Sequence, residues 1–275
     1  MDVRSRRLAF ALACLTLATC SENERRPIPD EEPEVASVGS SRSAPVSGAE
    51  FPIVEVVGEQ ILVDGEPAGD TRAATERLAK LDELFTRMKG LREAYKSANP
   101  DKPFPGVAGL RVGADTKLVA VKSAFQTMAY AGYPWISIQT IGTLAPIYSV
   151  TAQIPGPPRP MGEVDPRPPP KLLRIHADDA KITLTWQQGS VVIAEEKAQS
   201  ANLAAKVCST WKEHGTHQDA SDPVPDQVVL SASNRESFGE VTPILDAVNA
   251  CTRDYRDASG AVSKRPAFHV VFSIR

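Results

Sequence analysis

The chain has 275 residues, of which 42% are hydrophobic and 24% are charged, a composition that can form buried cores. Its formal net charge is -3 and it has no basic tract, so the composition gives no reason to expect nucleic-acid binding. The length allows one large domain or two small ones.

The first twenty residues are typical of an export signal. Three arginines precede an apolar run, residues 8–19, which would span about 18 Å as a helix. That is well short of the roughly 30 Å hydrocarbon core of a bilayer and fits a signal peptide at residues 1–20. The run ends in Leu-Ala-Thr-Cys, which is similar to a bacterial lipobox. Cys20 is therefore predicted to be lipidated, with ordinary signal cleavage as the alternative. Both alternatives predict the periplasmic side of a cell envelope.

Two segments of biased composition divide the remaining chain. Residues 21–50 are rich in Ser, Glu and Pro and have few large apolar side chains, so we expect a disordered tether. Residues 154–170 include eight prolines and predict a semi-rigid, extended linker. These breaks leave two segments of about 100 residues each, 51–153 and 171–275.

In the first segment, short alternating strands are predicted around the turns at Gly58-Glu59 and Asp64-Gly65. A long helix follows, with its leucines spaced three and four residues apart. In chain order, the predicted strands and helices are strands 54–57 and 61–63, helix 71–97, strand 107–112, helix 117–131 and strand 135–140.

The second segment repeats this order. Its predicted elements are strands 172–176, 182–186 and 191–194, helix 197–211, strand 227–232, helix 238–255 and strand 268–274. Val54 falls opposite Ile175 at an offset of 121, and Ala114 falls opposite Ala232 at an offset of 118. The pattern predicts an internal repeat of α+β class: two tandem two-layer sandwiches, each a mixed sheet with two helices on one face.

Several short motifs resemble a known family. Residues 54–67 (VEVVGEQILVDGEP) are similar to an opening hairpin, residues 110–116 (LRVGADT) to a strand ending in Ala-Asp, and residues 131–140 (AGYPWISIQT) to a closing strand. Residues 230–246 match the same strand–helix passage in the second segment. The family is the ExbD/TolR biopolymer-transport family, whose periplasmic domain the chain resembles in two copies. The matched positions are Gly65, Asp115, Gly132, Gly239 and Asp246.

The resemblance implies a non-enzymatic periplasmic accessory protein. Family members have a transmembrane helix with a membrane-embedded Asp, whereas residues 8–19 have no carboxylate. Proton translocation is therefore not implied. The implied partners are envelope proteins of ExbB/TolQ-like or TonB/TolA-like systems, or peptidoglycan, with a lipid anchor on the membrane. No cofactor is implied, and the two copies could form an internal pseudo-dimer.

Few residues suggest chemistry. His214, His217 and Asp219 have plausible metal-ligand spacing, but three ligands from one loop are weak support, and a solvated loop is the simpler interpretation. They define the alternative of a metal-dependent envelope enzyme. A purely structural envelope lipoprotein is a further alternative. No catalytic serine motif or phosphate-binding loop is present, so no catalytic or metal-binding residue is assigned.

Two further cysteines form an even pair. Cys208 and Cys251 lie near the ends of the two predicted helices of the second segment, in a compartment where disulfides form. A disulfide between them is predicted, and it would close a loop of about 43 residues. Two separate buried thiols are the alternative.

Overall fold

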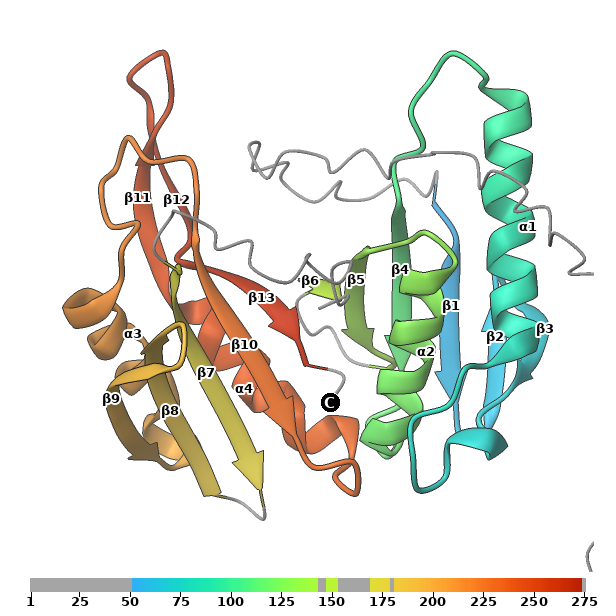
Figure 1. The fold of residues 1–275 in the computed structure, drawn as a ribbon, viewed down its shortest axis with the longest axis horizontal. Helices are drawn as coiled ribbons and strands as arrows, with labels where there is room; N and C mark the ends of the chain where they lie inside the picture. Colours follow the sequence, from blue (N-terminus) through green and yellow to red (C-terminus); the bar gives the residue numbers. More distant parts are fainter. Residues whose placement is uncertain (1–50, 143–146, 153–168, 179–180, 274–275) are drawn as a thin grey trace, which may run out of the picture. The chain divides into compact units, whose positions relative to one another are not determined.

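The computed structural model describes residues 51–142, 147–152, 169–178 and 181–273 (Figure 1). All of them belong to one compact unit, Gly39–Arg275. The predicted signal peptide, lipidation site and tether, and most of the proline-rich linker, lie outside the described residues. Within the described ranges, none of the helices has the length and apolar character needed to cross a membrane.

The first half of the unit contains six strands and two α-helices. They are β1 (Ile53–Val57), β2 (Gln60–Val63), β3 (Glu66–Asp70), α1 (Asp82–Ala98), β4 (Val107–Val112), α2 (Leu118–Tyr130), β5 (Trp135–Thr140) and β6 (Tyr148–Ala152). A single 3-10 turn, Arg72–Ala74, precedes α1.

The second half contains seven strands and two α-helices. They are β7 (Lys171–Asp178), β8 (Lys181–Gln188), β9 (Val191–Ala198), α3 (Leu203–His214), β10 (Asp226–Ala232), α4 (Phe238–Ala250), β11 (Thr252–Arg256), β12 (Val262–Pro266) and β13 (Phe268–Phe272). The strands β11 and β12 form a separate antiparallel hairpin.

The other eleven strands form one continuous mixed sheet in the order β3-β2-β1-β4-β5-β6-β13-β10-β7-β8-β9 (Figure 1). Read from the two edges inward, the halves have the same order, 3-2-1-4-5 and 9-8-7-10-13, with β6 between them. The strand β6 pairs antiparallel with β5 and parallel with β13.

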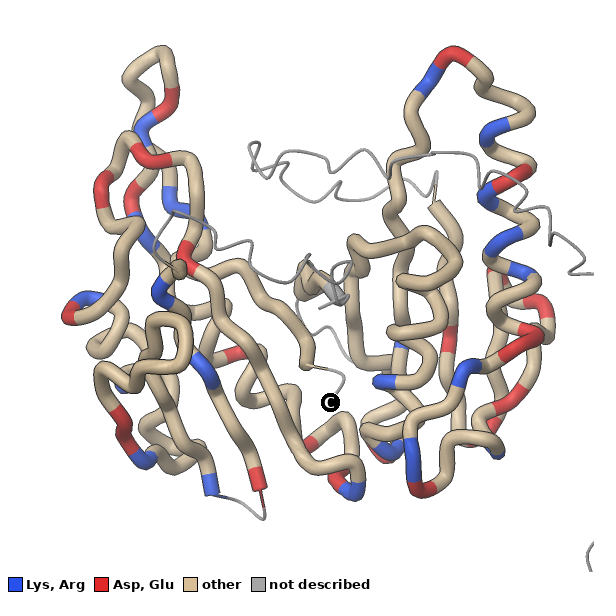
Figure 2. Tube along the Cα trace, viewed as in Figure 1, with Lys and Arg blue, Asp and Glu red and all other residues tan. Residues whose placement is uncertain are grey.

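The strands β1, β2, β5, β7 and β8 bury alternate side chains, as expected for strands covered on one face. In the middle of the sheet, Ile136, Val150 and Val270 are paired across three strands and are all at most 8% exposed. Leucines, valines and aromatic residues of all four helices belong to the same core. The central strands β5, β6 and β13 have no charged residue, and Figure 2 shows this middle part of the sheet in tan.

The prediction of two tandem small sandwiches is wrong, because the strands form one large sheet. Each half would otherwise end at an open strand, β5 in the first and β13 in the second. The five residues of β6 satisfy the backbone groups of both strands, so the sheet does not stop between the halves. The predicted sequence of strands ended at residue 140 and therefore missed the strand that joins the halves.

Two predicted helices also differ from the structure. The helix predicted at 71–97 begins only at Asp82, which with Glu83 places two carboxylates in its first turn. The helix predicted at 238–255 ends at Ala250, and the chain continues as β11. Alternation of polar and apolar residues in Thr252–Arg256 is too short to distinguish a strand from a helix end.

Candidate functional site

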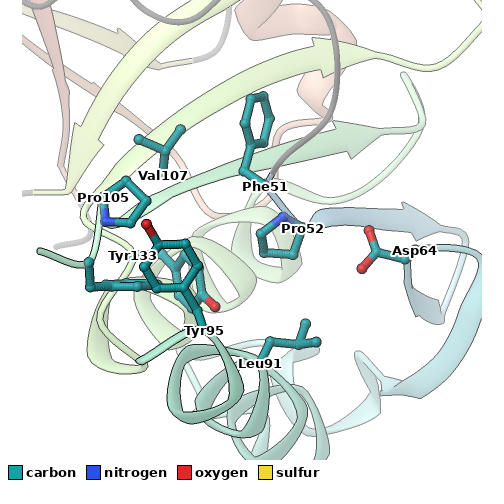
Figure 3. A pocket seen from close by; sticks show the side chains of 9 residues that line it. Phe51, Pro52, Asp64, Leu91, Tyr95, Pro105, Val107 and Tyr133 are labelled. Carbon is teal, nitrogen blue, oxygen red and sulfur yellow. The ribbon is translucent and has the colours of Figure 1, made fainter. Parts of the chain in front are cut away.

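An open cavity of about 340 Å³ lies beside the C-terminal half of α1 (Figure 3). We call it the aromatic hollow. Its walls come from five separate segments of the first half, and the residues are Phe51, Pro52, Asp64, Leu91, Tyr95, Phe104, Pro105, Val107 and Tyr133.

Edge-to-face contacts hold the aromatic walls of the hollow. The Tyr95 and Phe104 ring centroids are 5.5 Å apart at 72°, and those of Phe104 and Tyr133 are 5.0 Å apart at 84°. Such pairs are favourable beyond their buried area. The Tyr133 hydroxyl donates a hydrogen bond to the Met88 carbonyl at 3.3 Å, which ties this wall to α1. The hollow therefore presents ring edges and faces that are already fixed.

Asp64 is the acidic residue of the hollow and lies at its side in Figure 3. It has a left-handed backbone conformation (φ 53°) in the β2–β3 turn, next to the motif residue Gly65. Its Oδ1 accepts a hydrogen bond from the Ile53 amide at 2.9 Å. Among the described residues, Oδ2 has no such donor. The hollow thus combines aromatic and proline rings with one carboxylate, which suits an apolar ligand with a positive charge.

We expect Tyr133→Phe to make folding less sensitive to alkaline pH. Burial raises the pKa of the Tyr133 hydroxyl to about 12 from its ordinary value of about 10. Between these values the unfolded chain releases the proton while the folded chain keeps it, so stability falls as pH rises. The full two-unit window corresponds to at most about 2.7 kcal/mol. Urea unfolding at about pH 9 and about pH 11.5 should show a smaller fall for the variant. Equal falls would contradict this assignment.

The motif positions Asp115 and Gly239 lie where the N-termini of α2 and α4 meet. The Gly239 amide donates to the Ala114 carbonyl at 2.7 Å, and a Cβ at Gly239 would lie 3.0 Å from the same oxygen. Glycine is therefore needed for the two loops to approach this closely. Asp115 lies in the turn before α2, beside Gly113.

The contacts between these two helix starts are reciprocal. Phe238 N donates to Thr116 O at 2.8 Å, and Leu118 N donates to Glu236 O at 2.7 Å. Lys117 and Ser237 are paired between these bonds. These contacts relate Lys117 in the first half to Ser237 in the second, a separation of 120 positions. The predicted offset of 118 at Ala114 is therefore wrong by two. The predicted offset of 121 fits the strands, because Val54 pairs with Leu110 as Ile175 pairs with Leu230.

The other motif residues have structural contacts. Gly132 ends α2 with a positive φ of 102°, and a Cβ there would lie 2.9 Å from Arg92 Cδ. Asp246 of α4 accepts a hydrogen bond from the Tyr148 hydroxyl at 2.5 Å, which connects α4 to β6. Burial raises the pKa of the Tyr148 hydroxyl, and the bond to Asp246 raises it further. These positions connect helices to the sheet and do not line the aromatic hollow.

The three residues with metal-ligand spacing do not converge. The His214 ring contacts Trp186 at a tilt of 55° with ring centroids 6.1 Å apart, and His217 Nδ1 lies 2.6 Å from Asp222 Oδ2. Asp219 accepts hydrogen bonds from the Ser221 amide and hydroxyl. In the described part of the chain, no group of three potential ligands could hold a metal ion. The alternative of a metal-dependent enzyme therefore has no support from this loop.

Sequence reasoning missed Asp226, the residue around which this loop is organised. Its carboxylate is 1% exposed and accepts bonds from Trp211 Nε1 at 2.8 Å and from the Thr216 and His217 amides at 3.0 and 3.1 Å. The buried Arg253 donates to the His217 carbonyl at 3.2 Å. The signal in the sequence is slight, because Asp226 reads simply as a polar residue before a strand.

Cys208 and Cys251 are free thiols in the structure, and a hydrogen bond joins their side chains. Burial raises the pKa of the Cys251 thiol, and the neighbouring Cys208 raises it further. The ends of α3 and α4 thus bring the two sulfur atoms together. The disulfide between them stays a prediction.

Comparison with known proteins identifies no family for this chain. No protein-family model matches the chain, and no curated protein matches it. Two similar solved structures are of the Aquifex aeolicus PPX-GPPA enzyme and of the Aquifex aeolicus member of the Ppx/GppA protein family. Both are 9% identical to this chain and cover 66% of it, with TM-scores of 0.20 and 0.19. The match spans 66% and 65% of those chains, just under two thirds.

Such low TM-scores carry no argument about the fold or activity of this chain. The expectation that the chain is not an enzyme is withdrawn, and no activity is assigned to the chain from this similarity.

Proposed function

We propose that this chain is a partner-binding protein on the periplasmic side of a cell envelope, anchored by lipid at Cys20. The sequence features behind the location are the leader, residues 1–20, and the ExbD/TolR-like motifs. The observation that supports partner binding is the open edge of the large sheet at β9. The occupant we propose is an extended segment of an envelope protein, added to the sheet as a further strand.

The edge strand β9 has the properties that promote strand addition. It has eight residues, and among the described strands it pairs only with β8 (Figure 1). Three consecutive apolar residues at its start, Val191, Val192 and Ile193, are 65%, 55% and 41% exposed. A long, apolar edge strand with unpaired backbone groups is a template for another strand. Near its other end, Lys206 Nζ donates a hydrogen bond to the Lys197 carbonyl at 2.6 Å, so the available edge is residues 191–195, with a bulge at Ile193.

The opposite edge, β3, is protected. It has five residues, and Pro67 removes one backbone donor while Gly69 adopts a positive φ of 110°. The Glu66 and Arg87 side chains form an ion pair beside it. The contrast between the two edges indicates that the exposure of β9 is a local property of its sequence. Glu195 beyond the apolar residues favours a partner segment with apolar residues followed by a basic one.

A photo-crosslinking amino acid at Val192 is expected to form discrete adducts with an envelope protein in cells. The same probe at Val262, which is 58% exposed on the separate hairpin, is the matched control and should form none. Ile193→Lys places a charge on the open edge and should reduce the Val192 adduct at least about tenfold, because edge lysines oppose strand addition. Equal adducts from both positions would contradict the proposal, as would an adduct of two copies of this chain.

A separate experiment tests the proposed lipid anchor at Cys20. Expressed with its own leader, the protein should sediment with membranes and carry acyl chains on Cys20, because two signals or chains are needed for stable anchoring. A Cys20→Ser variant should be released from the membrane or remain unprocessed. Intact-mass measurement distinguishes these states, and a soluble native protein that begins at Ser21 would refute lipidation.

A further inference from the structure

We propose that the aromatic hollow binds this chain's own proline-rich linker. The occupant is Pro-Gly-Pro-Pro-Arg-Pro, residues 155–160, with the Arg159 guanidinium at the Asp64 carboxylate. This inference does not depend on the proposed partner at β9, because the hollow and the β9 edge lie in different halves of the sheet.

The chemistry of the hollow matches this segment. Proline-rich segments are already extended as polyproline II, and they bind in grooves lined by aromatic side chains at a small entropic cost. Phe104 contacts both Tyr95 and Tyr133 edge to face, so the hollow provides three such rings. Asp64 adds a carboxylate with one oxygen that no described donor occupies. Arg159 lies between two prolines of the segment, and its guanidinium is the cation that the proposal pairs with Asp64.

The linker begins beside the hollow. Thr151, next to the end of β6, is paired with Trp135 of β5, and Trp135 is paired with Val107 of β4. Val107 lines the hollow. Neighbouring strands are about 4.8 Å apart, so the linker leaves the sheet about 10 Å from the hollow. Residues 153–154, at about 3 Å per residue, cover the first part of this distance.

Beyond the hollow, the linker is also long enough to reach the start of β7. The strand pairs place Arg174 of β7 in register with Val107 of β4, five strands away across the sheet. Lys171, where β7 begins, lies three residues further along the strand, so it is roughly 26 Å from Val107. The residues that remain, 161–170, span about 31 Å in polyproline II. The end of the linker is held elsewhere, since Gln188 Nε2 donates to the Pro169 carbonyl at 3.1 Å and Gly189 packs against the Pro169 ring. Of the two proline clusters, only the first is therefore left for the hollow.

The test uses a full-length variant in which residues 155–160 are replaced by Gly-Ser repeats of equal length. The probe is a labelled peptide with the sequence of residues 154–162. The variant is expected to bind the peptide saturably, with NMR shift changes at Tyr95, Phe104 and Tyr133. The parent protein should bind at least about tenfold more weakly, because the tethered segment competes at a high effective concentration.

Substitutions in the variant locate the site. Tyr95→Ala should abolish peptide binding, and Asp64→Asn should weaken it about threefold to tenfold, since Asn tolerates the same backbone conformation but has no charge. Tyr130→Ala is the control, because Tyr130 is 48% exposed on α2 and does not line the hollow. No binding to the variant, equal binding to parent and variant, or binding that survives Tyr95→Ala would each overturn the proposal. So would a parent protein that dimerises by exchanging linkers.

Discussion

Replacing Asp226 with Ala should destabilise the chain more than any other single carboxylate substitution proposed here, by about 3 to 5 kcal/mol. The change leaves three donors without their acceptor: the buried Trp211 indole and the part-buried amides of Thr216 and His217. Each unsatisfied buried group costs about 1–3 kcal/mol. Because small domains are stable by only about 5–15 kcal/mol, a loss of this size should shift the urea midpoint substantially.

The matched control for Asp226 is Asp219→Ala in the same loop. Asp219 is exposed and its bonds to Ser221 close a local turn, so its loss should cost less than about 1 kcal/mol. Asp226→Asn keeps the shape but turns amide hydrogens toward donors, so it should also be destabilising. Equal effects of Asp226→Ala and Asp219→Ala would show that the loop is not organised around the buried carboxylate.

Lys122→Ala should destabilise the chain by about 3 to 5 kcal/mol as well, for a different reason. Lys122 on α2 is 1% exposed, and its ammonium donates to the Ala232 carbonyl at 2.6 Å and to Asn234 Oδ1 at 2.9 Å. Both acceptors belong to the other half of the sheet. Burial lowers the pKa of Lys122, and the nearby Glu236 opposes this. The truncation removes the methylene stem and both bonds, leaving a cavity between the halves.

Lys122→Met separates the two contributions. It retains most of the buried volume and removes only the ammonium, so we expect a smaller loss of about 1–3 kcal/mol. Lys89→Met on the exposed surface of α1 is the control and should be nearly neutral. Urea unfolding measures all three variants. If Lys122→Met is as stable as the parent or more stable, desolvation of the ammonium outweighs its two hydrogen bonds.

The sequence is most informative where local pattern decides structure. Alternation around Val54 and Ile175 predicts strands that the structure contains, because β1 and β7 each bury one face. The join between the halves was not predictable in this way. Tyr148–Ala152 is a short run beside a proline-rich segment, and it pairs with β13 at a separation of 120 residues, as in Val150 and Val270. No local signal specifies such a pairing.

In the candidate site, too, features set by local sequence could be predicted and features set by distant contacts could not. The motif glycines could be identified because a left-handed turn or close approach needs glycine, as at Gly132 and Gly239. The aromatic hollow could not, because its walls come from five segments and only the fold brings Phe51, Phe104 and Tyr133 together. Lys122 reads as one more surface lysine on a helix, although it is buried between the halves.

The position of β6 also affects the order in which the sheet can be assembled during synthesis. One partner, β5, is made just before it, whereas the other, β13, is made more than 100 residues later. Until residues 268–272 are synthesised, β6 and β10 each have an open edge in the middle of what becomes the sheet. Parallel pairing over such a separation is slow to form, and unpaired edges promote association with other chains. The nascent chain therefore depends on its last strand to close the uncharged centre of the sheet.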